Sequence, residues 1–284
     1  MASEGGEHGG LSGYIDHHLQ HLANQHQEGL FDLSVVHFDT LFFSLLCAAI
    51  ILIALRIAAR KATSGVPGRF QAAVEWLVEM VNEQAGALVK GNTSYIAPLA
   101  LTVFCWVALM NAIDLLPVDL LPRMGQTIGI DYLRPLPTAD LNATLGMALG
   151  VLILVLTYSI KIKGVGGWLH ELVSAPFGMV KLSANPLTWV GALLLGVANF
   201  GLNIIEYLSK TLSHGMRLYG NMYAGELIFF LIAGLGGTAT VAGIAAHLLT
   251  GTAWAVFHIL IVLLQAYIFM MLTLVYIGQA HEHH

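Results

Sequence analysis

Long apolar runs separated by short polar connections dominate the chain. Residues 141–160 and 182–205 contain no charged side chain, and from residue 227 to residue 281 only histidines can carry a charge. A helix of about 20 apolar residues spans the hydrocarbon core of a bilayer. The pattern therefore predicts an all-α polytopic membrane protein with about five crossing helices. We place the spans at approximately 38–58, 94–116, 141–160, 187–234 and 241–279.

The fourth of these segments is too long for one upright helix. No proline and no pair of glycines interrupts residues 187–233. A continuous helix of this length would measure about 70 Å at 1.5 Å per residue, more than twice the hydrocarbon thickness of about 30 Å. The segment either breaks into two spans or crosses at a steep tilt. Gly234, Gly236 and Gly237 then predict a turn, so that residues 241–279 return as the second arm of a long tilted hairpin.

Residues 67–90 have a different pattern. Apolar side chains recur there at 3.6-residue spacing, whereas Glu75, Glu79 and Glu83 line another face. An amphipathic helix of this kind lies in the membrane interface or packs against a partner. The acidic face is either solvated or docks onto another subunit.

Composition supports the membrane assignment and excludes several soluble classes. Apolar residues make up 57% of the chain and charged residues 10%, against roughly 25% charged in a typical globular domain. Twelve Lys and Arg residues are too few for a nucleic-acid-binding protein, and two cysteines cannot build a disulfide scaffold. Cys47 and Cys105 both lie in apolar runs, where a small buried thiol is expected.

The basic residues predict the orientation of the chain. Connections on one side of the predicted spans carry no basic residue and two basic residues, and those on the other side carry five and three. The positive-inside rule therefore places residues 1–37, a polar and His-rich segment, outside the cytoplasm. Residues 38–284 form a single transmembrane domain, and five crossings leave the C-terminus in the cytoplasm.

A line of polar residues runs along the fourth segment at spacings of three or four, which keeps them on one helical face about 33 Å long. They could be hydrogen-bonding groups that join helices. The line comprises Asn199, Asn203, Glu206, Lys210, His214, Arg217 and Asn221.

Arg217 favours a functional role for this face. An arginine in the middle of a membrane costs about 2.5–3.5 kcal/mol, and its pKa is too high for it to become neutral. Glu206 is about 16 Å away along the helix axis, and Glu226 faces the opposite side. The missing partner is therefore expected to be a carboxylate of another subunit.

The last segment carries a second polar line. His258 and Gln265 are seven residues apart, and so share one face among apolar neighbours. A lone histidine there is either a satisfied core residue or a proton carrier. Because Glu226 faces away from Arg217, we predict a Glu226–His258 pair on a separate wet path, since these side chains relay protons in membranes.

Three stretches resemble subunit a of the F-type ATP synthase in its bacterial form. They are Arg217–Ile228 (RLYGNMYAGELI), Trp254–Ile261 (WAVFHILI) and Leu264–Met270 (LQAYIFM). The resemblance extends upstream through residues 114–117, 137–144 and 158–164, and covers roughly residues 30–280.

The resemblance implies a stator subunit that is not an enzyme on its own. It would provide two offset aqueous half-channels and couple proton flow to rotation of the c-subunit ring and to ATP synthesis. Arg217 would face the ring carboxylate, with Asn221 and Gln265 beside it on the periplasmic side of the proton path. Glu226 and His258 would line the periplasmic path. Glu206, Lys210 and His214 would line the cytoplasmic path.

Four more residues would frame the periplasmic entrance, unless they are ordinary helix caps. They are Asp114, Asp119, Asp140 and Asn142. The implied partners are the bilayer, the c ring, the b subunits of the peripheral stalk and the rest of the F1Fo complex, in a bacterial inner membrane. No nucleic acid, cofactor or metal is expected.

Other functions fit the sequence less well. An ion-coupled secondary transporter would show internal repeats, and residues 1–140 and 141–284 are not alike. A metal transporter would use the His-rich stretches 16–21 and 281–284, but no zinc-like spacing lies inside a span. These stretches are expected to be solvated.

Overall fold

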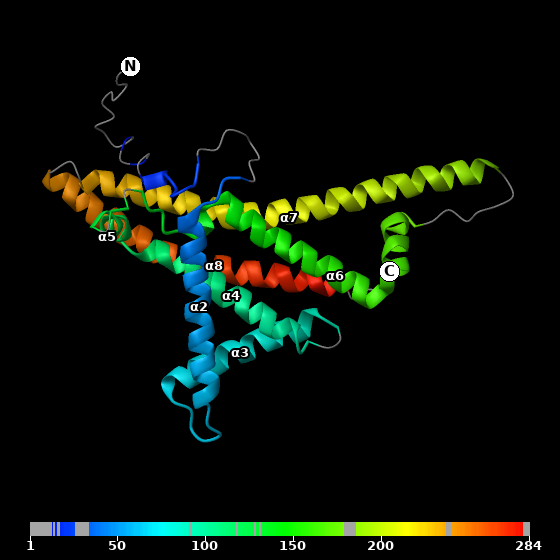
Figure 1. Cartoon of the computed structure of the whole chain (residues 1–284), viewed down its shortest axis with the longest axis horizontal. Coiled ribbons are helices and arrows are strands. Elements are labelled where there is room, and N and C mark those ends of the chain that lie inside the picture. The colour runs from blue at the N-terminus through cyan, green and yellow to red at the C-terminus, as the bar shows by residue number, and fades with distance from the viewer. Residues whose placement is uncertain are drawn as a thin grey trace, which may run out of the picture. The chain divides into compact units, whose positions relative to one another are not determined.

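A computed structural model of the chain describes residues 13, 15, 18–25, 34–90, 93–117, 119–127, 129–130, 132–178, 186–236 and 240–280. In this part of the chain, five helices are long and apolar enough to cross a membrane, as predicted. Figure 1 shows them. They are α2 (Phe38–Lys61), α4 (Ile96–Ala112, continued by the 3-10 turn η1, Ile113–Leu115), α6 (Leu141–Ser174), α7 (Pro186–Gly236) and α8 (Val241–Gln279).

The long fourth segment forms one helix rather than two. α7 runs without interruption for 51 residues, or about 75 Å (Figure 1). Residues 182–185 and Gly237, which belong to the predicted segment and its turn, lie outside the described residues, as does the tail 281–284.

α6 continues beyond the predicted end of the third span at residue 160. It reaches Ser174 across a kink at Gly164, where φ is 72°. Glycine adopts this left-handed conformation without a steric penalty, so the chain turns and a second helical stretch follows. The lysines at 161 and 163 mark the end of the uncharged run but do not end the helix.

Shorter helices occupy the connections. The stretch predicted to be an amphipathic helix forms α3 (Arg69–Leu88). The connection before α6 contains α5 (Leu120–Thr127) and the 3-10 turn η2 (Pro137–Ala139), neither of which was predicted.

The chain divides into two compact units. Unit 1 comprises Met1–Val74, Thr102–Thr144 and Leu218–Ile268, and unit 2 comprises Glu75–Leu101, Leu145–Arg217 and Phe269–His284.

In unit 1, the second part of α7 and the first part of α8 run antiparallel as a hairpin. Their side chains meet at successive levels: Asn221 contacts Gln265, and His247 contacts the carbonyl of Ile232. Many apolar side chains of this unit face outward, for example Leu45 on α2, which is 65% exposed. Such a surface suits lipid rather than water.

In unit 2, α3 and the end of α8 approach closely. A Cβ atom at Gly278 would lie 2.6 Å from the carbonyl oxygen of Leu88, so only glycine fits there. Around this contact the core contains Val81 and Ala85 from α3, and Leu274 and Ile277 from α8.

Candidate functional site

A buried ion pair lies at the centre of the polar residues of unit 1. It joins Arg134, in the connection before η2, to Glu226 on α7. The Arg134 guanidinium donates from Nη2 and Nε to the two carboxylate oxygens of Glu226, with 3.3 Å between Nε and Oε1. The two side chains are only 5% and 8% exposed. Burial lowers the pKa of Arg134, but the Glu226 carboxylate outweighs it, and the pKa is raised overall. The guanidinium therefore stays charged, and the bidentate geometry is of the strong type.

His258 on α8 pairs with Asp114 of η1. Its Nε2 lies 2.7 Å from Asp114 Oδ2, and the imidazole is fully buried. The ring also packs against α7, where a Cβ atom at Gly225 would come within 2.3 Å of His258 Cε1. Residue 225 therefore has to be glycine for the imidazole to reach Asp114.

These partners differ from the predicted Glu226–His258 pair. Among the described residues, the ion pair of Glu226 is with Arg134 and that of His258 is with Asp114. The reason is that a guanidinium satisfies both carboxylate oxygens of Glu226, which a single imidazole N–H cannot do.

Asn221 and Gln265, both expected near Arg217, contact each other. Asn221 Nδ2 donates to Gln265 Oε1 over 2.8 Å, which joins α7 to α8.

Asp140 is a helix cap, one of the two roles that were left open, and it also contacts His37 and Thr40. Its Oδ1 accepts from the backbone N–H of Asn142 over 2.9 Å, which caps α6. Its Oδ2 lies 2.7 Å from His37 Nδ1 and accepts from Thr40 Oγ1 over 2.9 Å. Asn142 therefore contributes its backbone to the cap.

Histidines of the N-terminal segment reach the acids of unit 1. His18 Nε2 lies 3.3 Å from Asp119 Oδ1, and Asp119 also accepts from Arg123 over 2.9 Å. His21 lies near Asp39, with 3.4 Å between Nδ1 and Oδ2, and His37 lies beside Asp140.

Arg134, Asp39 and the three histidines, which contact the acids of unit 1, were not predicted from the sequence as site residues. Arg134 entered only as one of the basic residues that predict the orientation. His18, His21 and His37 belong to no sequence motif that could indicate their partners. Asp39 did carry a signal, since it is an acid inside the first apolar span. It is fully buried and accepts from the backbone N–H groups of Leu22 and Arg134, over 3.1 Å and 3.2 Å.

Unit 2 contains a cavity of about 920 Å³ lined by the residues expected on the cytoplasmic path. Glu206 and Lys210 form an ion pair across one helical turn, and Lys210 Nζ also donates to Gln279 Oε1 over 2.8 Å. Their polar neighbours on the cavity wall include Lys163, His170, Glu171, Tyr207 and Tyr276.

His214 also lines this cavity but has no hydrogen-bond partner among the described residues. Its ring is buried and stacks on Phe269, with 3.9 Å between the ring centroids. A buried imidazole with both nitrogens free beside a cavity can accept or release a proton if water enters.

Arg217 is exposed on α7. Its Nη2 reaches only the hydroxyl of Ser213, at 3.5 Å, and no carboxylate of the described residues forms an ion pair with it. Beside it, Leu208, Leu212 and Met216 present an exposed apolar surface. The expected carboxylate partner on another subunit stays a prediction.

The apolar helices define a polytopic helical membrane protein, and its buried ionisable residues are of the kind that mark ion pathways in membranes. Comparison with known proteins makes this more specific. The family model described as ATP synthase A chain matches residues 41–278.

Curated relatives agree over nearly the full length. ATP synthase subunit a of Acidovorax sp. (strain JS42) is 58% identical over 283 residues, covering 96% of each chain. ATP synthase subunit a 1 of Methylococcus capsulatus is 49% identical over 284 residues, covering all of both chains.

The chain belongs to the ATP synthase A chain family. It has the stator role of this family in the membrane sector of the ATP synthase complex, and it is a non-catalytic, multi-pass membrane subunit. The predicted family and role are thereby confirmed, and the secondary-transporter alternative is set aside.

Proposed function

We propose that this subunit carries protons between the two sides of a bacterial inner membrane through two offset half-channels, and that Arg217 faces the carboxylates of a rotating c-subunit ring. The exposed guanidinium of Arg217, which lies in a largely apolar helix and forms no ion pair with a carboxylate of the described residues, is the observation that carries this proposal. A charge in that setting needs an anionic partner.

The division of the chain into units supports two separate paths. All eight residues expected on the periplasmic path lie in unit 1, and all three expected on the cytoplasmic path lie in unit 2. The periplasmic residues are Asp114, Asp119, Asp140, Asn142, Asn221, Glu226, His258 and Gln265, and the cytoplasmic residues are Glu206, Lys210 and His214.

The mechanism follows from the chemistry of these groups. A proton that enters past Glu226 and His258 neutralises a ring carboxylate, which can then turn into lipid. A ring site arriving from the other side meets Arg217, releases its proton to the cytoplasmic path and is held ionised by the guanidinium. The fixed charge of Arg217 also repels protons, which prevents a direct leak. The membrane potential supplies about 2.3 kcal/mol per charge per 100 mV.

Disulfide crosslinking tests the position of the ring. In a chain carrying Cys47→Ala and Cys105→Ala, we expect Leu212→Cys and Met216→Cys to crosslink to a cysteine placed beside the c-subunit carboxylate. Both positions are exposed on the apolar surface next to Arg217. The matched control is Thr211→Cys on the same helix, which is buried and should not crosslink. An assembled complex without crosslinks at residues 212 and 216 would contradict the proposal.

We also propose that the N-terminus is periplasmic and the C-terminus cytoplasmic, which the distribution of basic residues supports. Val66 between α2 and α3 and Gln20 in the N-terminal segment are exposed. In the same cysteine-free chain, a membrane-impermeant maleimide should label Val66→Cys only in inverted vesicles and Gln20→Cys only in right-side-out vesicles. The reverse pattern would overturn the orientation.

The proposed partners are the c ring, the b subunits of a peripheral stalk and the remaining subunits of the F1Fo complex. The acidic face of α3 is a candidate contact for one of them, because Glu79 and Glu83 lie on the exposed surface of this helix.

A further inference from the structure

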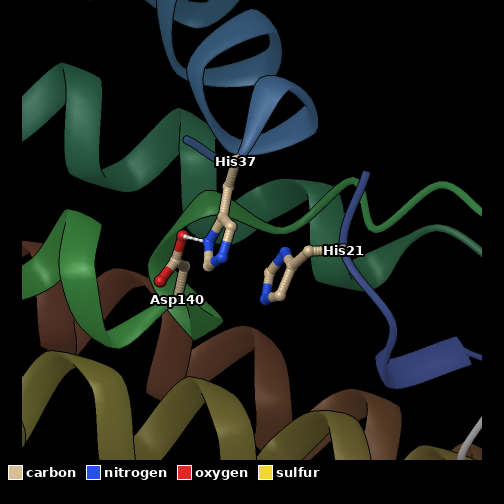
Figure 2. A group of neighbouring side chains, drawn as sticks. All are labelled: His21, His37 and Asp140. Carbon is tan, nitrogen blue, oxygen red and sulfur yellow. Dashed lines mark hydrogen bonds and ion pairs between the residues drawn. The ribbon is translucent and has the colours of Figure 1, made fainter. Parts of the chain in front are cut away.

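We propose that His21, His37 and Asp140 form a binding site for a divalent transition-metal ion of the zinc type. Each residue offers one ligand atom, and these atoms lie within 4.8 Å of one another. Figure 2 shows the two imidazoles and the carboxylate converging from three separate parts of the chain. No metal site was expected from the sequence, in which these three residues share no motif.

The backbone holds the two histidines together. Ala23 and His37 form an isolated antiparallel bridge, and Phe38 N–H donates to the Leu22 carbonyl over 2.9 Å. The imidazoles of His21 and His37 consequently stack, with 4.2 Å between centroids and 3° between planes. Their proximity follows from main-chain pairing and not from a chance side-chain rotamer.

Hydrogen bonds also fix the position of the Asp140 carboxylate. Oδ1 of Asp140 caps α6, which fixes the side chain and directs Oδ2 to His37 Nδ1 at 2.7 Å. Asp140 is buried, and the two histidines are partly buried. An ion would take the place of the hydrogen bond between His37 and Asp140, with His37 in the neutral tautomer that carries its proton on Nε2 and its lone pair on Nδ1.

The donor set determines the class of ion. Two imidazole nitrogens and one carboxylate oxygen suit zinc and its transition-metal neighbours, whereas calcium and magnesium require mostly oxygen ligands. Three protein ligands leave one tetrahedral position for water.

A carboxylate lies behind His21. Asp39 Oδ2 lies 3.4 Å from His21 Nδ1, a contact that is not a hydrogen bond but places a negative charge behind the ring. A small movement of the ring would make it the carboxylate contact that orients a metal-binding histidine. The other nitrogen, Nε2, lies 3.0 Å from Arg134 Nη1. Because a guanidinium only donates, this Nε2 carries a lone pair and not a proton. The ion would use that lone pair in place of the Arg134 contact.

Electrostatics around the cluster favour a cation. Asp39 and Asp140 contribute two negative charges, and the charge of Arg134 is already balanced by Glu226. The ligand atoms of a tetrahedral zinc site lie about 3.3 Å apart, given bonds of about 2.0 Å. Binding would therefore draw the three side chains together and turn the stacked rings out of parallel.

Zinc content measures the site directly in the purified, assembled complex. After chelation and dialysis against a limiting concentration of zinc chloride, we expect His21→Gln and His37→Gln each to lose one zinc per complex relative to the unmodified protein. The double variant should lose no more than one, because both residues hold the same ion. His18→Gln is the matched control from the same segment and should keep the full content, since His18 pairs with Asp119. The single variants should bind this zinc at least tenfold more weakly.

X-ray absorption of the unmodified complex with one equivalent of zinc provides a measurement that does not depend on any variant folding. The expected shell contains two imidazole nitrogens and oxygen donors at about 2.0–2.1 Å. Unchanged zinc content in both single variants, additive losses in the double variant, or a shell without imidazole would overturn the proposal. The site does not depend on the roles proposed for the proton path.

Discussion

Replacing Arg217 by alanine is expected to abolish proton-driven ATP synthesis and ATP-driven proton pumping together. An interaction with a charged group in a site of low dielectric is worth about 3 kcal/mol, which corresponds to roughly a hundredfold change in the equilibrium it controls. Without the guanidinium, a ring carboxylate keeps its proton as it passes, and no barrier separates the two paths. Both activities can be measured in inverted membrane vesicles.

Arg217→Lys should fail as well, because a lysine ammonium is a point charge and cannot reproduce the planar fork of arginine. Arg69→Ala is the control, since Arg69 is an exposed arginine at the start of α3 and should retain both activities. Proton pumping that survives in an assembled Arg217→Ala complex would show that the charge is dispensable, and the proposed mechanism would be wrong.

Arg134→Leu is expected to destabilise the subunit by about 3–5 kcal/mol, because it leaves the Glu226 carboxylate buried without its partner. The backbone N–H of Arg134, which donates to Asp39, is unaffected by this change. Thermal dissociation of the purified complex measures the loss of stability. Arg123→Leu is the control, since its ion pair with Asp119 is largely exposed and is worth less than about 1 kcal/mol.

The double variant Arg134→Leu/Glu226→Leu separates structure from transport. Replacing a buried ion pair by apolar residues is often neutral for stability, so thermal dissociation should return close to that of the unmodified complex. Proton transport should stay low, because Glu226 is proposed to lie on the periplasmic path. Recovery of both properties would show that the pair is only structural and that protons take another route.

Helical architecture was predictable because it depends on local patterns. Length and hydropathy alone predicted about five crossing helices, and the structure has five helices able to cross a membrane among its described residues. Spacing also identified the polar face of α7 and the isolation of Arg217. By contrast, the pattern left two possibilities for the fourth segment, and the structure shows a single helix.

The partners of the buried polar side chains could not be predicted where they lie in the irregular connections between helices. Arg134 and Glu226 are 92 residues apart, His37 and Asp140 are 103 apart, and His258 and Asp114 are 144 apart. Helical spacing relates residues within one helix, and it says nothing about a loop side chain that folds back onto another helix. The prediction of a Glu226–His258 pair was therefore wrong, because each of the two buried side chains has a different partner.

By itself, the sequence determined the membrane class, the helical fold, the family and the face of α7 that carries Arg217. These properties follow from hydrophobic runs, helical periodicity and family motifs, all of which are patterns of residues close together in the sequence. Only the tertiary structure decided that Glu226 is held by Arg134, that His258 is held by Asp114, and that His21 and His37 meet Asp140. Such contacts depend on how distant segments pack, because a buried charge takes whichever partner the packing brings within reach.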